Sequence, residues 1–202
     1  MREVVITSAV RSPIGTFGGV FKELSPTQLM VPVLDEVVKR SKLEKHEVEE
    51  IILGHCIQRT DEPNTARVSA LKANFPDKTT GYTIQRQCAS GLQAIISAAM
   101  QIQLGHATVM IAGGVEAMSS SPYLLKQHRW GSRLQHGQIT DSVWEILEDP
   151  IHHIMMGETA ENVAEEWGIS REEQDELALT SQNRALDAIE TGSFSEEIVR
   201  LS

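Results

Sequence analysis

The stretch GYTIQRQCASGLQAIISAAMQIQL, residues 81–104, predicts a strand, a tight turn and a helix in immediate succession. Its first five residues include three β-branched or aromatic side chains, which is typical of a strand. The helix is indicated by apolar residues at the i, i+3, i+4 and i+7 spacing of one helix face: Leu92, Ile95, Ile96 and Ala99. The turn between them, Cys88–Gly91, places a cysteine at the start of the helix.

Strands and helices alternate on both sides of this unit. Further strands are expected at three apolar runs: Val4–Ile6, Glu50–Gly54 and Ala107–Ala112. Helices are predicted over residues 64–74 and from Ser25, an N-cap followed by proline, with Pro32 predicting a kink or a later start. The pair Gly113-Gly114 predicts close backbone packing near the cysteine turn. This alternation predicts an α/β fold with a mixed, largely parallel sheet and helices on both of its faces.

The pattern changes after Met118. Residues 119–157 have weak periodicity and hold four of the seven histidines, which indicates an excursion over the surface of the core. Two helices are predicted next, one over about residues 158–167 and one from a capping box that begins at Ser170. We therefore divide the chain into an α/β domain, residues 1–118, and a second part, residues 119–202. Because the last residues, 198–202, resemble an incoming strand that is cut short, we expect the second part to be truncated.

The composition excludes several classes of protein. With 41% hydrophobic and 23% charged residues, the chain is typical of a globular protein rather than a disordered one. The 18 basic and 28 acidic residues give a net charge of −10, which argues against nucleic-acid binding. No apolar run reaches the roughly 18 residues of a membrane span, so we expect no membrane insertion. Two cysteines without metal-ligand spacing predict no disulfide framework, no metal site and a reducing, cytoplasmic location.

Cys88 is the candidate for covalent chemistry because of its position. A helix N-terminus carries roughly half a positive charge, which favours a thiolate over a thiol. The small residues Ala89, Ser90 and Gly91 allow a substrate to approach the sulfur, and the backbone amides of the turn can stabilise an oxyanion. The alternative for Cys88 is plain packing, since cysteine is often buried. Cys56 follows a strand without such a turn, and we expect it to be buried or a spectator.

Five segments, in order along the chain, resemble signatures of the thiolase family. They are the N-terminal run Val4–Gly15, the hexapeptide Gln87–Leu92, the signature Gly113–Ser119, the loop residues Pro122–Leu125 with Arg129–Gly131, and the segment Met156–Asn162. The resemblance covers essentially the whole chain. It implies the N-terminal half of the thiolase fold plus the beginning of the family's loop domain, with the C-terminal thiolase domain absent from residues 1–202.

The resemblance also implies an activity. The Cys88 thiolate would attack the thioester carbonyl of acetyl-CoA or a 3-ketoacyl-CoA and release CoA, which leaves an acyl-cysteine. A second acetyl-CoA would then take the acyl group in a Claisen condensation, so that two acetyl-CoA give acetoacetyl-CoA, or the reverse thiolysis occurs. The backbone N–H of Cys88 would belong to the oxyanion hole. No cofactor is implied, since the coenzyme A thioester is itself the substrate.

Three more residues are implied to border the substrate. Leu147 matches a contact to the pantetheine arm, and Met156 matches the residue beside the acyl group. Met155 stands where many biosynthetic members of the family carry histidine. The alternative for both methionines is packing at the start of a helix. We expect His152 and His153 to be solvated loop residues rather than catalytic bases.

Other interpretations are kept open. Related enzymes are a 3-ketoacyl-CoA thiolase of fatty-acid β-oxidation and a ketoacyl synthase, and the residues around Cys88 argue against the second.

Gln85 stands where the family usually has Asn or Ser. The family's histidine base, water-ordering asparagine and second cysteine have no match here, so a catalytically incompetent dimerising fragment is the non-enzyme alternative. Because thiolases dimerise through their N-terminal halves, we expect a homodimer or homotetramer, with exposed apolar surface.

Overall fold

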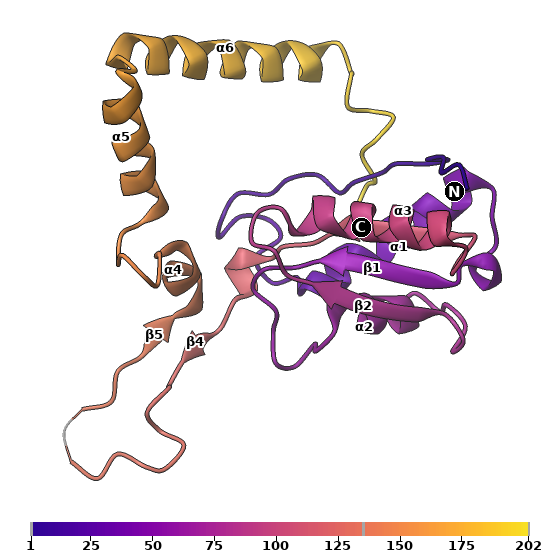
Figure 1. Cartoon of the computed structure of the whole chain (residues 1–202), viewed down its shortest axis with the longest axis horizontal. Coiled ribbons are helices and arrows are strands. Elements are labelled where there is room, and N and C mark those ends of the chain that lie inside the picture. The colour runs from indigo at the N-terminus through magenta and orange to yellow at the C-terminus, as the bar shows by residue number, and fades with distance from the viewer. Residues whose placement is uncertain (1, 135, 202) are drawn as a thin grey trace. The chain divides into compact units, whose positions relative to one another are not determined.

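The computed structural model describes residues 2–134 and 136–201 and is shown in Figure 1. The chain divides into two compact units. The first unit comprises Met1–Ser121 together with Glu197–Ser202, and the second comprises Pro122–Glu196. Each unit has its own sheet, and the first contains the cysteine turn.

A parallel sheet forms the centre of the first unit. Its strands lie in the spatial order β2-β1-β3, with the bounds β1 (Glu50–Gly54), β2 (Thr80–Ile84) and β3 (Met110–Gly114). The register places Gly54, the last residue of β1, beside Ile84 on one side and beside Gly114 on the other. The carboxyl ends of the three strands therefore meet at one edge. This arrangement confirms the predicted parallel sheet, although β3 begins three residues later than Ala107 and includes both glycines.

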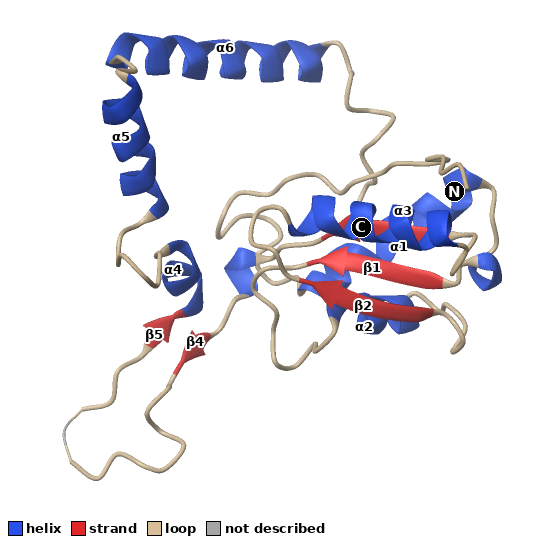
Figure 2. Ribbon diagram, in the orientation of Figure 1, coloured by secondary structure: helices blue, strands red, loops and turns tan. Residues whose placement is uncertain are grey.

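Helices cover both faces of this sheet, as Figure 2 shows. The three α-helices of the first unit's described residues are α1 (Pro26–Ser41), α2 (Thr65–Lys72) and α3 (Ser90–Leu104). Because side chains alternate along a strand, Ile51 and Leu53 pack with α1 and α2 on one face. Ile52, between them, packs with Ala94 and Ala98 of α3 on the other face. The predicted α/β layers are confirmed.

The helix α1 begins where the sequence predicts. Ser25 Oγ accepts a hydrogen bond from the Gln28 N–H, and the Gln28 side chain accepts one from the Ser25 N–H, which is a capping box. Pro26 occupies the first helical position, where a missing N–H costs nothing. Pro32 lies inside the helix without ending it, so the predicted later start is wrong.

The periodicity of α3 predicts the helix correctly but not its buried face. Leu92, Ile95 and Ile96, on the predicted stripe, are 62%, 44% and 42% exposed. The face that packs on the sheet carries the small residues Ala94 and Ala98, which are 0% and 6% exposed. Small side chains let the helix lie close to the strands, and the expected exposed apolar surface is found on the larger residues.

The strand predicted at Val4–Ile6 is wrong. Within residues 2–134 and 136–201 this segment pairs with no strand, and Val5 and Ile6 are 70% and 79% exposed. An apolar run forms a strand only where a neighbouring strand supplies hydrogen bonds and a packed face, and Val4–Ile6 has neither. The hydropathy of a segment does not show whether such a neighbouring strand is present.

The strand predicted near the C-terminus is reduced to a single bridge. Arg11 pairs with Ile198 in parallel orientation. The Arg11 N–H donates to the Glu197 carbonyl at 2.9 Å, and the Val199 N–H donates to the Arg11 carbonyl at 2.7 Å. Val199 is 8% exposed, so this short contact packs the C-terminal residues of the first unit against its N-terminal segment.

The second unit combines a small antiparallel sheet with helices. Its described elements are β4 (Tyr123–Leu124), β5 (Thr140–Asp141), α4 (Ser142–Leu147), α5 (Met156–Trp167) and α6 (Arg171–Glu190). The predicted capping box starts α6, because Ser170 Oγ and the Glu173 carboxylate bond each other's backbone N–H. No described helix has both the length and the apolar character that crossing a membrane requires.

Candidate active site

Residues with reactive or charged side chains gather at the carboxyl edge of the parallel sheet. His55 and Cys56 follow β1, Cys88 follows β2, and Glu116 follows β3. Ligands of open parallel sheets bind outside this edge, because loops and helix N-termini converge there. The topology thereby joins Cys56 and Glu116, which are 60 positions apart, to the turn that carries Cys88.

Cys88 lies directly before α3 with an exposed side chain. Ala89 is the N-cap of the helix, and Ser90 is its first residue. The turn is closed by the Ala89 N–H, which donates to the Arg86 carbonyl at 3.1 Å, and by the Ser90 N–H, which donates to the Gln87 carbonyl at 2.9 Å. Arg86 and Cys88 also form an isolated bridge, so the backbone of Cys88 is part of the turn.

The residue before the cysteine, Gln87, has a left-handed backbone. Its φ is +48°, a region that costs a residue other than glycine on the order of 1–3 kcal/mol. Ser90 Oγ donates to the Gln87 carbonyl at 2.6 Å and accepts from the Arg86 N–H at 2.7 Å. The thiol of Cys56 donates to the same Gln87 carbonyl at 3.0 Å. These contacts hold a backbone conformation that is unfavourable by itself.

Glycines at two strand ends let α3 approach the sheet. A Cβ atom on Gly54 would lie 2.3 Å from the carbonyl carbon of Ser90 and 2.4 Å from the nitrogen of Gly91. A Cβ atom on Gly114 would lie 3.0 Å from the Gly54 oxygen and 3.4 Å from the Gly91 Cα. The predicted close packing is confirmed for Gly114, whereas a Cβ on Gly113 would meet only a leucine methyl at 4.0 Å.

Glu116 ties the loop after β1 to the loop after β3. Its carboxylate accepts hydrogen bonds from the Cys56 N–H at 3.0 Å and from the Ile57 N–H at 3.3 Å. Burial opposes ionisation of Glu116, but His55 and the two amides outweigh it and hold its pKa below the ordinary value. The group is therefore a carboxylate at neutral pH and anchors the backbone of Cys56.

His55 lies beside the Glu116 carboxylate. The side chain is 1% exposed, and its Nδ1 lies 2.8 Å from the hydroxyl of Thr65, the first residue of α2. Its Nε2 lies 3.3 Å from Glu116 Oε1, off the line of a good hydrogen bond. We assign the Nε2-protonated tautomer, because Thr65 can then donate to Nδ1 while Nε2–H faces the carboxylate.

Cys56 is half-buried rather than buried, and its expected spectator role stays a prediction. Its sulfur contacts the Gln87 carbonyl and lies 3.7 Å from Ser90 Oγ, so it touches the turn that carries Cys88. Burial raises the pKa of the Cys56 thiol, and the nearby Glu116 carboxylate raises it further. Cys56 therefore keeps its proton at neutral pH and is a hydrogen-bond donor rather than a nucleophile.

The three residues predicted to border the substrate lie in the second unit. Leu147 ends α4, Met155 is the N-cap of α5, and Met156 is its first residue. The loop between the two helices closes on itself, because Glu148 and Met155 form an antiparallel bridge. Met156 is 48% exposed, so packing within the chain does not bury its side chain fully. The structure thus brings these three residues to the two ends of one short loop.

The two histidines of that loop are solvated, as predicted. The side chains of His152 and His153 are 71% and 74% exposed. His152 Nδ1 lies 2.6 Å from the Asp149 carboxylate, and His153 Nδ1 lies 3.2 Å from the Glu148 carboxylate. The Ile151 N–H and His152 together hold the pKa of Asp149 below its ordinary value. Among the described residues, no group of three or more His, Cys, Asp or Glu side chains is placed to hold a metal ion.

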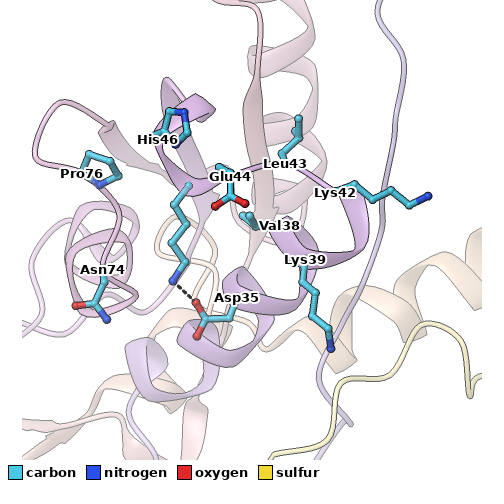
Figure 3. A pocket seen from close by; sticks show the side chains of 10 residues that line it. Asp35, Val38, Lys39, Lys42, Leu43, Glu44, His46, Asn74 and Pro76 are labelled. Carbon is cyan, nitrogen blue, oxygen red and sulfur yellow. Dashed lines mark ion pairs between the residues drawn. The ribbon is translucent and has the colours of Figure 1, made fainter.

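A groove of about 710 Å³ lies at the other edge of the sheet (Figure 3). It is lined by the second half of α1, by residues 42–46, which precede β1, and by Asn74 and Pro76, which precede β2. Lys45 Nζ, at the edge of this groove, lies 2.6 Å from the Asp35 carboxylate. Because this groove lies at the amino ends of the strands, it is separate from the site around Cys88.

A family model described as "Thiolase, N-terminal domain" matches residues 4–202, nearly the whole chain. The chain belongs to the thiolase family. Known thiolases agree with this assignment in sequence. Beta-ketothiolase BktB of Cupriavidus necator is 44% identical over 201 residues, which are 98% of this chain and 50% of that protein. A probable acetyl-CoA acyltransferase of Staphylococcus aureus is 39% identical over 203 residues, covering 100% of this chain and 52% of the relative.

A solved thiolase agrees in structure. The crystal structure of the Bacillus anthracis acetyl-CoA acetyltransferase superimposes with a TM-score of 0.95 and 72% sequence identity. The match covers 96% of this chain and 50% of that one. The chain therefore has the fold of the N-terminal thiolase domain, and it spans about half the length of the relatives it matches.

Sequence reasoning missed three residues that lie around the turn of Cys88: His55, Cys56 and Glu116. Glu116 belongs to the signature Gly113–Ser119 but has no titratable neighbour along the sequence. Its role depends on the parallel register of β1 and β3, which ends both strands at the same level. The usable signal is that β1 and β3 each end in glycine and are followed within two residues by ionisable side chains.

Proposed function

We propose that this chain is the nucleophile-bearing part of a thiolase-type acetyl-CoA acyltransferase and that Cys88 accepts the acyl group. The observation that carries the proposal is the exposed Cys88 directly before α3, at the carboxyl edge of a parallel sheet, in a chain of the thiolase family. The names of the similar proteins, acetyl-CoA acyltransferase and acetyl-CoA acetyltransferase, support acetyl-CoA as the acyl donor.

The proposed acylation uses groups that the chain itself provides. The Cys88 thiolate attacks the thioester carbonyl, and the carbonyl oxygen becomes an oxyanion as the tetrahedral intermediate forms. The Cys88 N–H and the positive N-terminal end of α3 stabilise that negative charge. Collapse of the intermediate breaks the carbon–sulfur bond to CoA, which leaves as a thiolate. The product is an acyl-cysteine and free CoA.

The acyl-cysteine is then used by a second acetyl-CoA, which gives acetoacetyl-CoA and regenerates Cys88. This step requires a base that removes a proton from the methyl group of the second substrate. His55 is buried between Thr65 and Glu116 and does not fit that role. Acylation is therefore the half-reaction for which the described residues around Cys88 provide the groups.

Substrate contacts and assembly complete the proposal. Leu147, Met155 and Met156 give an apolar, adaptable border for the pantetheine arm and the acyl group. No cofactor other than the CoA thioester is proposed. A homodimer or homotetramer is expected from the family, and light scattering measures it directly. A strictly monomeric chain would overturn the oligomer without affecting the acylation proposal.

The test is intact-mass spectrometry of the chain after incubation with acetyl-CoA. The proposal predicts that the wild-type chain gains the mass of one acetyl group and that Cys88→Ala gains none. Far-UV circular dichroism of both proteins controls for folding. A folded wild-type chain without adduct would contradict the proposal and favour a dimerising fragment without activity.

A second candidate function is thiolysis or condensation of longer 3-ketoacyl-CoA substrates. It is favoured by the 44% identity to a beta-ketothiolase. Acyl-CoA esters of increasing chain length separate the two functions in the same mass assay. An acetyltransferase forms its adduct fastest from acetyl-CoA, whereas a longer-chain thiolase forms it at least as fast from butyryl- or hexanoyl-CoA.

A further inference from the structure

We infer that Cys56 is a positioning residue: together with Ser90 it fixes the Gln87–Cys88 peptide group and thereby aims the Cys88 N–H at the oxyanion. This inference rests on the proposed acylation of Cys88. It assigns to the second cysteine of the chain a role that neither the sequence pattern nor the family match provides.

Three hydrogen-bond donors converge on the carbonyl oxygen of Gln87. The Gln87 oxygen accepts from Ser90 Oγ at 2.6 Å, from the Ser90 N–H at 2.9 Å and from Cys56 Sγ at 3.0 Å. In a trans peptide group, the C=O and the N–H point in opposite directions in one plane. Donors that fix the Gln87 carbonyl therefore also fix the direction of the Cys88 N–H.

The orientation of the Gln87–Cys88 peptide group needs these donors, because the backbone conformation of Gln87 is unfavourable by itself. Gln87 has a φ of +48°, in a left-handed region that residues other than glycine rarely occupy. Relief of this conformation requires rotation about the N–Cα bond of Gln87, which would move the Gln87 carbonyl away from its donors and turn the Cys88 N–H with it. Of the donors, the Ser90 amide is part of the helix start, whereas the Ser90 hydroxyl and the Cys56 thiol are supplied by side chains.

Cys56 itself is held in place. Its N–H donates to the Glu116 carboxylate at 3.0 Å, and the neighbouring Ile57 N–H donates to the same carboxylate at 3.3 Å. Glu116 is supported in turn by buried His55. The thiol is thus attached to the loops after β1 and β3 and reaches the turn after β2, so all three strands determine its position.

The role of Cys56 also depends on its protonation state. A thiol donates a hydrogen bond, whereas a thiolate beside a carbonyl oxygen repels it. Burial raises the pKa of the Cys56 thiol, and Ser90, Glu116 and Cys88 are the other groups that face it. Cys56 therefore remains a donor at the neutral pH at which Cys88 reacts, and the two cysteines have different roles.

The test compares two reagents that react with the same Cys88 sulfur. Acylation by acetyl-CoA passes through an oxyanion and needs the Cys88 N–H, whereas alkylation by iodoacetamide needs only the thiolate. The variants are Cys56→Ala, which removes the donor, and Cys56→Ser, which restores a donor of similar size. Peptide mapping separates modification of Cys88 from modification of Cys56.

We expect the rate of Cys88 acetylation to fall about two- to tenfold in Cys56→Ala, the effect of one net hydrogen bond, and to recover in Cys56→Ser. The rate of Cys88 alkylation and its pH profile should be unchanged in both variants. Equal losses in both reactions, or no recovery with serine, would overturn the inference in favour of a general structural role. Unchanged acetylation in Cys56→Ala would also overturn it.

A second readout is independent of acylation. The ¹³C chemical shift of the Gln87 carbonyl reports the hydrogen bonds that it accepts. It should move upfield in Cys56→Ala and stay near the wild-type value in Cys56→Ser. If the wild-type chain forms no acetyl adduct, the proposed function fails, and this shift still decides the positioning role. An identical shift in wild type and Cys56→Ala would contradict that role.

Discussion

The sulfur of Cys56 lies 3.0 Å from the carbonyl oxygen of Gln87, the residue that directly precedes Cys88. This contact joins the loops after β1 and β2, which are 31 positions apart in sequence. Gln87 needs such support because of its left-handed backbone. The proposed nucleophile, Cys88, is therefore placed by two features together, the N-terminus of α3 and a set of side chains that hold the preceding peptide group.

Removing the charge of Glu116 should loosen this arrangement. In Glu116→Gln one oxygen remains for the Cys56 and Ile57 amides, and an NH₂ group faces a donor that it cannot satisfy. We expect a loss of about 1–3 kcal/mol in the free energy of unfolding, measured by urea denaturation, together with slower acetylation of Cys88. Glu23→Gln is the matched control, because the Glu23 side chain is 87% exposed. Equal stability of the two variants would contradict the anchoring role of Glu116.

The stability of the first unit should fall in acid because of Glu62. Burial opposes ionisation of Glu62, but Lys72 Nζ at 2.8 Å and the hydroxyls of Thr27 and Ser25 outweigh it, and its pKa falls to about 2. A carboxyl with a depressed pKa stabilises the fold fully above its unfolded-state value of 4.5. That stabilisation is lost as the pH falls from about 4.5 to about 2.

The Glu62 contribution is on the order of 3 kcal/mol at neutral pH. Urea denaturation at a series of pH values measures it. The wild-type free energy of unfolding should decrease steadily below about pH 4.5, and Glu62→Gln should be less stable at neutral pH but flatter over the same interval. Parallel curves for the two proteins would show that Glu62 does not carry the acid sensitivity.

A methyl group at Gly54 should displace the start of α3. Its Cβ would lie 2.3 Å from the Ser90 carbonyl carbon and 2.4 Å from the Gly91 nitrogen, which are both backbone atoms at the start of α3. We expect Gly54→Ala to lose about 2–3 kcal/mol of stability and to form little acetyl adduct. Gly91→Ala is the matched control for stability, since a Cβ there meets nothing within 4 Å and alanine favours a helix. Similar thermal unfolding midpoints for the two variants would contradict the close packing.

Cys56 and Ser90 should act on the same atom. Each side chain donates to the Gln87 carbonyl, so the effects of Cys56→Ala and Ser90→Ala on the acetylation rate should not add. We expect Ser90→Ala to be the slower single variant, because the Arg86 N–H also loses its acceptor. The double variant measures the coupling. Strictly multiplicative rate losses would indicate that the two side chains work at separate places.

Local signals predicted most of the fold. The Ser25 cap, the strand before the cysteine turn and the helix after it all lie where the sequence places them, because each depends on neighbouring residues. Val4–Ile6 and the packing face of α3 were predicted less well, since both depend on what lies across from them. Ala94 and Ala98 face the sheet although larger apolar residues lie elsewhere on α3.

The candidate site was predictable only in part. Cys88 stands out because a cysteine at a strand-to-helix turn is visible in a few consecutive residues. Cys56 and Glu116 do not, because their contact depends on parallel strands that end at the same level. The positive φ of Gln87 is what makes the contact with the Cys56 thiol important. The residue type does not predict this conformation, since glycine is the usual residue at a positive φ.

The most direct test of Cys88 as the acyl acceptor is to locate the acetyl group after reaction with acetyl-CoA. Proteolysis followed by tandem mass spectrometry separates the peptide that contains Cys88 from the one that contains Cys56. We predict acetyl on Cys88 alone, in a linkage that hydroxylamine cleaves as it cleaves a thioester. Acetyl on Cys56, on lysine side chains only, or on no residue of the folded chain would contradict it.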